Sequence, residues 1–269
     1  MANIEPKQIV SLLAKIKQEK PLIHHITNWV TIYDCANITR TIGALPVMAH
    51  APEEVEEMTG IASALVLNIG TLTEELMQAM YLAGKAANKK GIPVVVDAVG
   101  VGATKFRTEK FRELAEKVKL SVIKGNISEM GIIAGVKAEV KGVEAMSVDG
   151  TPEMIAKKVA AAYGCTAAIT GKTDVVSDGA KTFLVNNGHL MMGSIVGTGC
   201  MAASAIGVFA AVEKDRALAS ASALSVMGIA GELAAAKSNG PGTFKEAFFD
   251  EMYNLNEAKI AKYAKVELP

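Results

Sequence analysis

Two apolar strand segments separated by a helical segment constrain the fold more than any other feature of the chain. Residues 64–69 (Ala-Leu-Val-Leu-Asn-Ile) and 93–97 (Pro-Val-Val-Val-Asp) are apolar almost throughout, as is typical of strands covered on both faces. Between them, residues 73–90 form a helical segment that begins at a capping threonine and is followed by Gly91. Because strands joined through a helix lie parallel, this arrangement predicts a parallel sheet with helices on both faces.

The same alternation continues through the first two-thirds of the chain, and no linker or repeat interrupts it. It ends at two short strand segments, residues 174–177 and 181–185, joined at Asp178-Gly179, a strong hairpin signal. We therefore predict one α/β domain over residues 1–269, with a mostly parallel central sheet and an antiparallel edge hairpin. The other predicted strands are residues 22–26, 45–48, 120–123 and 166–170, and the other predicted helices are residues 5–20, 30–42, 52–58, 105–118, 151–163 and one each from about residues 128 and 243.

Composition argues against several classes of partner. The 28 Lys and Arg residues balance the 28 Asp and Glu residues, so we expect binding neither to nucleic acid nor to an anionic membrane. Residues 195–212 and 217–231 are uncharged, but each is shorter than the about 20 apolar residues of a membrane span. We interpret them as a buried helical hairpin joined by the polar turn 213–216. Three scattered cysteines and the absence of a secretory signal predict a cytoplasmic protein.

The loop Gly197-Thr-Gly199-Cys200 precedes the first of these two helices. Its glycines leave backbone N–H groups accessible at the positive end of a helix dipole, which suits a phosphoryl oxyanion. Cys200 occupies the position where an aspartate would be expected to take a proton from an attacking alcohol. A helix N-terminus favours the thiolate, so Cys200 is a candidate base or nucleophile, although inert packing is the usual role of a buried cysteine.

Polar residues follow several predicted strands, at the edge where open α/β sheets bind ligands. Asp97 ends an apolar strand, and Asn126 and Glu129 straddle a strand-to-helix turn. A carboxylate with Asn and Glu nearby suits a hydrated Mg²⁺ that bridges nucleotide phosphates. The structural alternative is that Asn126 and Glu129 cap a helix and that Asp97 caps a loop.

Two further glycine motifs lack the context that nucleotide binding requires. Gly171-Lys172-Thr173 would end a Walker A loop only if residue 166 were glycine, and it is threonine. Residues 197–202 match a dinucleotide fingerprint formally, yet no clear βαβ unit follows them. We therefore disfavour a P-loop enzyme and a nicotinamide-dependent one.

Taken in order, these motifs resemble those of the hydroxyethylthiazole kinases of thiamine salvage, which have the ribokinase-like fold. The resemblance covers nearly the whole chain and is carried by residues 21–30, 43–51, 97–107, 123–129, 170–179 and 197–200. Cysteine stands at position 200, where sugar kinases of this fold have aspartate. The resemblance implies a three-layer sandwich that phosphorylates the primary alcohol of 4-methyl-5-(2-hydroxyethyl)thiazole with ATP.

The resemblance also implies roles for residues around the acceptor alcohol. Met48 would lie against the thiazole, Asn28 would contact it through polar groups, and Gly197 is the family's other substrate-binding position. Gly199 and Cys200 would form the anion hole beside the hydroxyl, with Cys200 as a modest general base.

A second set of roles concerns ATP and the metal. Thr170, Lys124 and Asn126 would contact ATP, and Asp97 and Glu129 would lie around Mg²⁺. Relatives commonly have arginine at position 124, so lysine replaces a bidentate fork with a point charge.

The resemblance further implies a homotrimer that binds its substrate between neighbouring subunits. Three alternatives stay open at this point. The chain could be a pyrimidine-alcohol kinase of the same fold, a non-catalytic thiazole- or nucleotide-binding protein, or a cysteine-dependent hydrolase that needs no ATP.

Overall fold

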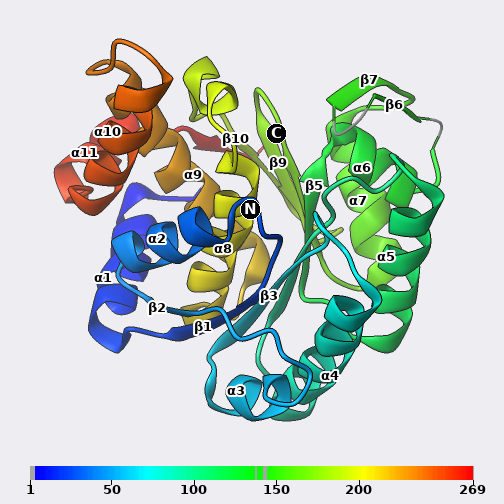
Figure 1. Ribbon diagram of the computed structural model, residues 1–269. Coiled ribbons are helices and arrows are strands. Elements are labelled where there is room, and N and C mark those ends of the chain that lie inside the picture. Colours follow the sequence, from blue (N-terminus) through cyan, green and yellow to red (C-terminus); the bar gives the residue numbers. More distant parts are fainter. Residues whose placement is uncertain (1–3, 137, 142–143, 269) are drawn as a thin grey trace.

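A nine-stranded sheet forms the centre of the structure, a computed structural model that describes residues 4–136, 138–141 and 144–268 (Figure 1). The strands lie in the order β11-β10-β9-β8-β5-β4-β3-β1-β2. Their bounds are β1 Leu22–Ile26, β2 Leu45–Val47, β3 Ala64–Asn68, β4 Val94–Asp97, β5 Val122–Asn126, β8 Thr166–Thr170, β9 Asp174–Ser177, β10 Thr182–Val185 and β11 Val266–Glu267. Neighbours from β2 to β8 pair in parallel, whereas β9, β10 and β11 add antiparallel pairs at one edge. The predicted α/β sheet with an antiparallel edge hairpin is confirmed.

Helices cover both faces of this sheet and give the molecule three layers (Figure 1). The helices of one side are α1 Pro6–Glu19, α2 Ile32–Ile42, α8 Thr198–Val212, α9 Arg216–Ala235, α10 Pro241–Tyr253 and α11 Glu257–Tyr263. The helices of the other side are α3 Val55–Ile61, α4 Glu74–Lys90, α5 Lys105–Lys117, α6 Ile127–Ile133 and α7 Pro152–Tyr163. The remaining elements are the 3₁₀ helix η1 Leu190–Ser194 and a two-stranded sheet of β6 Ala138–Lys141 and β7 Glu144–Val148.

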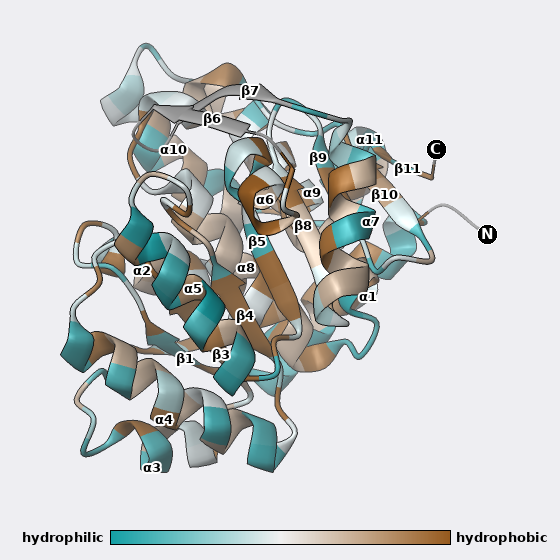
Figure 2. Ribbon diagram, turned by 90° about the vertical axis from the view of Figure 1, so that its right-hand side faces the viewer, coloured by the Kyte–Doolittle hydropathy of each residue, from teal (hydrophilic) through white to brown (hydrophobic). Residues whose placement is uncertain are grey.

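The alternation of side chains along each strand produces two hydrophobic cores. In β4, Val95 packs into the core beneath α8 and α9, whereas Val94 and Val96 pack into the core beneath α4 and α5. This double burial explains why β3 and β4 are apolar at successive positions. Figure 2 shows the apolar strands β4 and β5 behind α5, which is largely hydrophilic.

The uncharged segments near residue 200 form the buried helical hairpin that the sequence predicts. Helices α8 and α9 pack against each other, and α8 also packs against β3 and β4. By length and composition α9 could cross a membrane, but 83% of its apolar window is buried inside the fold. Small residues are needed here, because a Cβ at Gly207 would lie only 2.4 Å from Val66 Cγ2.

Several element boundaries differ from the predictions for local reasons. Pro52 lies in a turn, where Glu54 N and Val55 N both donate to Ala51 O, so α3 begins only at Val55. Strand β5 runs to Asn126, beyond the predicted end at residue 123. The single helix predicted from residue 243 is two helices, since Asn256 caps the start of α11. The predictions missed β6, β7 and β11; two-residue β11 is too short to show a periodicity.

Candidate active site

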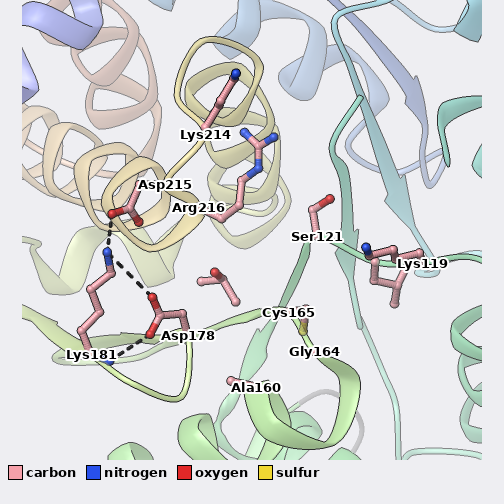
Figure 3. Close-up of a pocket in the computed structure, with 12 residues that line it drawn as sticks. Lys119, Ser121, Ala160, Gly164, Cys165, Asp178, Lys181, Lys214, Asp215 and Arg216 are labelled. Atoms are coloured by element: carbon pink, nitrogen blue, oxygen red, sulfur yellow. Dashed lines mark hydrogen bonds and ion pairs between the residues drawn. The ribbon is translucent and has the colours of Figure 1, made fainter. Parts of the chain in front are cut away.

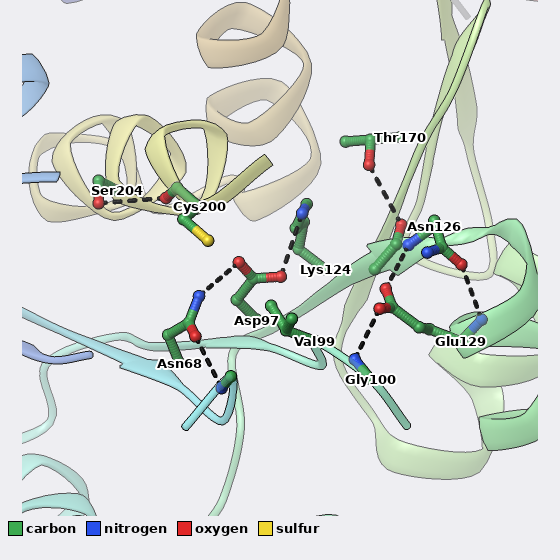
Figure 4. Close-up of polar contacts among 12 residues, drawn as sticks. Asn68, Asp97, Val99, Gly100, Lys124, Asn126, Glu129, Thr170, Cys200 and Ser204 are labelled. Carbon is green, nitrogen blue, oxygen red and sulfur yellow. Dashed lines mark hydrogen bonds and ion pairs between the residues drawn. The ribbon is translucent and has the colours of Figure 1, made fainter. Parts of the chain in front are cut away.

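A row of polar side chains crosses the sheet where β3, β4 and β5 end (Figure 4). Asn68 is in register with Asp97, and Asp97 is in register with Lys124, so the three side chains point to the same face of the sheet. Asp97 is fully buried and Lys124 is 4% exposed. Asp97 Oδ1 accepts from Lys124 Nζ at 3.1 Å, and Asp97 Oδ2 accepts from Asn68 Nδ2 at 2.7 Å. The buried carboxylate is therefore both ion-paired and hydrogen-bonded, as a buried charge must be.

Burial and charge act in opposite directions on this pair. Burial raises the pKa of Asp97, and the Lys124 ammonium opposes that shift. Burial alone would lower the pKa of Lys124, but the carboxylates of Asp97 and Glu129 outweigh it and raise that pKa. Lys124 consequently stays a cation inside the protein, at the edge of the sheet where its strand ends.

Helix α8 directs its N-terminus at this cation. Gly197 has a φ of +102°, and a Cβ there would lie 3.0 Å from Thr31 Cγ2, so both conformation and space require glycine. A Cβ at Gly199 would lie 3.1 Å from Lys124 Nζ. The start of α8 therefore lies against the Lys124 ammonium, an arrangement in which backbone N–H groups and a buried cation favour an anion.

Cys200 lies in the first turn of α8, and its sulfur points toward Asp97 (Figure 4). Asn28 Nδ2 donates to Cys200 Sγ at 3.4 Å and to Asn68 Oδ1 at 2.9 Å. Burial, reinforced by the Asp97 carboxylate, raises the pKa of the Cys200 thiol. The thiol is therefore protonated at neutral pH, contrary to the thiolate that a helix N-terminus alone would favour.

A nucleophilic cysteine would also need a base, and the two buried histidines are engaged elsewhere. His24 bonds to Thr59 Oγ1 at 2.9 Å and to Ala49 O at 2.8 Å. His25 contacts Thr39 Oγ1 at 3.4 Å, and burial lowers the pKa of His25 to about 4. These contacts argue against the hydrolase alternative.

Asn126 and Glu129 form the capping box that the structural alternative describes. Asn126 Oδ1 accepts from Glu129 N at 3.0 Å, and Glu129 Oε2 accepts from Asn126 N at 2.7 Å. Glu129 Oε1 also accepts from Gly100 N at 2.8 Å, which ties the loop after β4 to α6. Each carboxylate oxygen keeps a second lone pair, so the capping contacts do not use up the capacity of Glu129 to accept a further donor or a metal ion.

A metal ion would need ligands beyond the protein. In the part of the chain that the structure describes, no three His, Cys, Asp or Glu side chains are grouped to hold one. Asp97 ends β4 and Glu129 lies in the first turn of α6, and both carboxylates interact with Lys124. Two oxygen donors completed by phosphate and water are a donor set that Mg²⁺ accepts in nucleotide enzymes.

The remaining predicted residues lie on either side of this cluster. Thr170 ends β8 in register with Asn126, and its Oγ1 lies 3.5 Å from Gly125 O (Figure 4). Met48 follows edge strand β2, where Met48 O lies 3.3 Å from His50 Nδ1. The His50 ring packs edge-on against Trp29, at 4.8 Å between centroids. This contact joins the segment after β2, which contains Met48, to the segment after β1, which contains Asn28.

Two polar residues at the site had no predicted role. Asn68 joins Asn28 to Asp97 through its amide. The signal that could have identified Asn68 was its position at the end of a strand, in register with Asp97 on the next strand. Asp174 accepts from Gly171 N at 2.9 Å, and burial raises the pKa of Asp174 to about 7. Asp174 thereby shapes the turn that follows Thr170.

Known proteins resemble this chain along its whole length. A family model described as the hydroxyethylthiazole kinase family matches residues 13–258. This chain belongs to that family. Hydroxyethylthiazole kinase of Methanosarcina acetivorans is 59% identical over 92% of this chain and 95% of its own length. The Methanosarcina mazei protein of that name is 58% identical over 95% of this chain and 98% of its own length.

Solved structures agree with the family assignment. A hydroxyethylthiazole kinase protein from Pyrococcus horikoshii OT3 has a TM-score of 0.89 and 40% identity, covering 98% of this chain and 99% of that one. A ribokinase-like superfamily protein from Enterococcus faecalis has a TM-score of 0.61 at 14% identity, covering 88% of each chain, and shows the fold alone. The predicted ribokinase-like fold and kinase class are thus confirmed, and the chain is a phosphotransferase of the hydroxyethylthiazole kinase family.

The buried ion pair of this family member generates a prediction on stability. Lys124→Met should leave the Asp97 carboxylate buried without its cation and cost about 3–5 kcal/mol of unfolding free energy. Asp97→Asn in the same chain should restore most of that loss, because a neutral amide needs no counter-charge. Denaturant unfolding followed by circular dichroism measures both differences.

The matched control is Lys105→Met, which removes a lysine from the exposed pair with Glu109. We expect this control to change stability by less than about 1 kcal/mol. Equal losses for Lys124→Met and Lys105→Met would contradict the assignment of Lys124 as a structural counter-ion.

Proposed function

We propose that this protein transfers the γ-phosphoryl group of ATP to the primary hydroxyl of 4-methyl-5-(2-hydroxyethyl)thiazole. The observation that carries the proposal is that the start of α8, Lys124 and Cys200 lie together beside the buried Asp97 carboxylate. Phosphoryl transfer depends mainly on positioning and on neutralising charge on the moving group. Backbone donors facing a buried cation supply both. Residues 1–269 act as one domain in this proposal, which the continuous nine-stranded sheet supports.

The roles of individual groups follow from their positions. The N–H groups of the Gly197–Gly199 loop bind the oxygens of the transferring phosphoryl group, and Lys124 offsets their charge. Gly197 and Met48 contact the thiazole alcohol. The hydrogen-bonding groups of Asn28 are taken up by Asn68, Cys200 and residues 30–31, so Asn28 serves the acceptor side chiefly by holding Cys200.

Cys200 contributes modestly in this mechanism. A protonated thiol is a weak base, so the hydroxyl proton leaves late, when bond formation to phosphorus has already made the oxygen acidic. The neutral thiol orients the hydroxyl by hydrogen bonding, and the hydroxyl proton passes to an oxygen of the transferred phosphoryl group or to water.

ATP and Mg²⁺ occupy the opposite half of the site in this proposal. Thr170 and Asn126, in register at the ends of β8 and β5, contact the nucleotide together with Lys124. Asp97 and Glu129 hold Mg²⁺ through water or directly. The ion would supply neutralisation of the phosphate charge.

We also propose a homotrimer with substrate bound between neighbouring subunits. Apolar side chains flank both halves of the acceptor site in the single chain: Val30 is 68% exposed, Tyr33 75% and Val196 69%. Such side chains next to Asn28 and Gly197 suit burial against another copy of the chain. The three cysteines are free, which supports a reducing, cytoplasmic location.

The direct test of the proposed reaction is ADP release. The purified protein with ATP and Mg²⁺ should release ADP when thiazole alcohol is added, in equal amount with thiazole phosphate, and little without an acceptor. A pyrimidine alcohol in place of the thiazole distinguishes the related kinase. Binding of both ligands without ADP release would instead identify a non-catalytic binding protein.

Substitutions at Cys200 and Gly199 should differ greatly in severity. General acid–base catalysis contributes roughly 10²–10⁴-fold, so Cys200→Ala should stay measurably active, with a loss at the low end of that range. Cys200→Asp should be competent, because a carboxylate can accept the same proton. Gly199→Val should be far worse, since its side chain would strike Lys124 and obstruct the backbone donors. Steady-state kcat for each variant is the measurement.

The control for these variants is ATP binding by the folded protein, followed by calorimetry. If Cys200→Ala and Cys200→Asp bound ATP normally but were both inactive, the thiol would be an obligatory nucleophile. The kinase mechanism given above would then be wrong.

Subunit mixing tests the shared site. Met48→Trp should block the acceptor pocket from one subunit, and Gly199→Val should destroy the anion site of its neighbour. After subunit exchange, some sites would combine an intact Met48 with an intact Gly199 and regain activity. Each variant mixed with itself is the control. Continued inactivity after verified exchange would argue that both residues act within one subunit.

A further inference from the structure

One arginine donates hydrogen bonds to both of the turns that follow β3 and β4, the strands that end at Asn68 and Asp97. Arg107, near the start of α5, donates through Nη1 to Val99 O at 3.0 Å and to Ile69 O at 3.3 Å. Its Nη2 donates to Gly70 O at 2.6 Å. The first carbonyl follows β4 and the other two follow β3, so a single guanidinium holds together the turns after Asp97 and Asn68. The mechanism proposed above gives this side chain no role.

The loop after β4 requires glycine at position 100, because the Arg107 side chain lies against it. Gly100 has a φ of +79°, and a Cβ there would lie 2.7 Å from Arg107 Nη1 and 3.0 Å from its Cδ. Gly100 N also donates to Glu129 Oε1. The loop is therefore held by Arg107 on one side and by Glu129 on the other.

Hydrogen bonds connect Arg107 to the reacting groups without any direct contact. Gly70, whose carbonyl Arg107 binds, donates through its N–H to Asn68 Oδ1 at 2.9 Å. This contact fixes the orientation of the Asn68 amide, because the oxygen must face Gly70 N–H and the nitrogen must then face Asp97. The same Asn68 oxygen accepts from Asn28, which in turn donates to Cys200.

We propose that Arg107 is a positioning residue for phosphoryl transfer, acting through the Gly70 turn and the Asn68 amide on Asp97 and Cys200. The guanidinium suits this task because its donors form a rigid planar fork, which lysine lacks. A displacement of about 1 Å at reacting groups can cost on the order of 10²-fold in rate. The inference rests on the proposed function of this same site.

The test compares Arg107 with an arginine that plays a similar structural part elsewhere. Arg216, which lines a pocket with Asp178 and Lys181 (Figure 3), also donates to two backbone carbonyls, those of Ala210 and Glu213, at the far end of α8. Arg107→Met and Arg216→Met should both lower the unfolding temperature. Only Arg107→Met should lower kcat, by about 10²-fold with little change in KM for either substrate, as expected for lost positioning. Arg107→Lys should fall between Arg107→Met and the unmodified protein.

Two further variants keep the proposal falsifiable if Arg107→Met folds poorly. Gly100→Ala should displace the guanidinium without removing it and should lower kcat in the same way. In an Asn68→Ala background, Arg107→Lys should cost little more, because the route through Asn68 is already broken.

The outcomes separate this inference from the proposed function. Wild-type kcat in folded Arg107→Lys and Gly100→Ala, or fully additive losses with Asn68→Ala, would overturn the positioning role. Failure of the unmodified protein to phosphorylate thiazole alcohol would instead overturn the proposed function.

Discussion

The ion pair between Asp97 and Lys124 is the interaction on which the rest of the site depends. Both groups are buried, and each would be costly to bury without the other. The parallel register of β4 and β5 places the two residues side by side, so the sheet itself holds the pair. A hydrogen bond from Asn68 connects the pair to β3. The N-terminus of α8 lies next to Lys124 and connects the pair to the helical layer.

In the proposed mechanism, this arrangement makes a strong base unnecessary. Burial, together with the Asp97 carboxylate, raises the pKa of Cys200 and keeps the thiol neutral, whereas Lys124 remains charged. The Lys124 cation and the start of α8 would then offset the charge that develops on the phosphoryl group. In such a site, preorganised electrostatics contribute more than proton removal. Lysine at position 124 fits this picture, because its compact ammonium pairs with Asp97 on the neighbouring strand.

The sequence predicted the sheet, and it pointed to several members of the polar cluster, because both depend on local patterns. The apolar runs of β3 and β4 identified buried parallel strands, and Asp97, Lys124 and Thr170 follow or end such strands. The connections around them were not predictable in the same way. Neither Asn68 nor Arg107 has a local pattern that shows its partners, since Arg107 reaches carbonyls 37 and 38 residues away in the chain. The strands β6, β7 and β11 were missed because short, irregular pairings leave little periodicity.

Asn126 and Glu129 combine a structural role with a proposed functional one. The sequence suggested both ATP or metal binding and helix capping for this pair, and the structure displays the capping contacts in full. The two interpretations are compatible, because capping holds the buried Glu129 carboxylate in place and leaves each of its oxygens a further lone pair.

The most direct measurement of the central claim is the position of a transition-state mimic. A crystal structure with ADP, Mg²⁺, thiazole alcohol and aluminium fluoride would place a planar mimic of the moving phosphoryl group. We expect the fluoride ligands to lie within hydrogen-bonding distance of the Gly199 backbone N–H and of Lys124 Nζ, with the alcohol oxygen beside Cys200. A mimic bound away from the start of α8, with Lys124 contacting only Asp97, would contradict it.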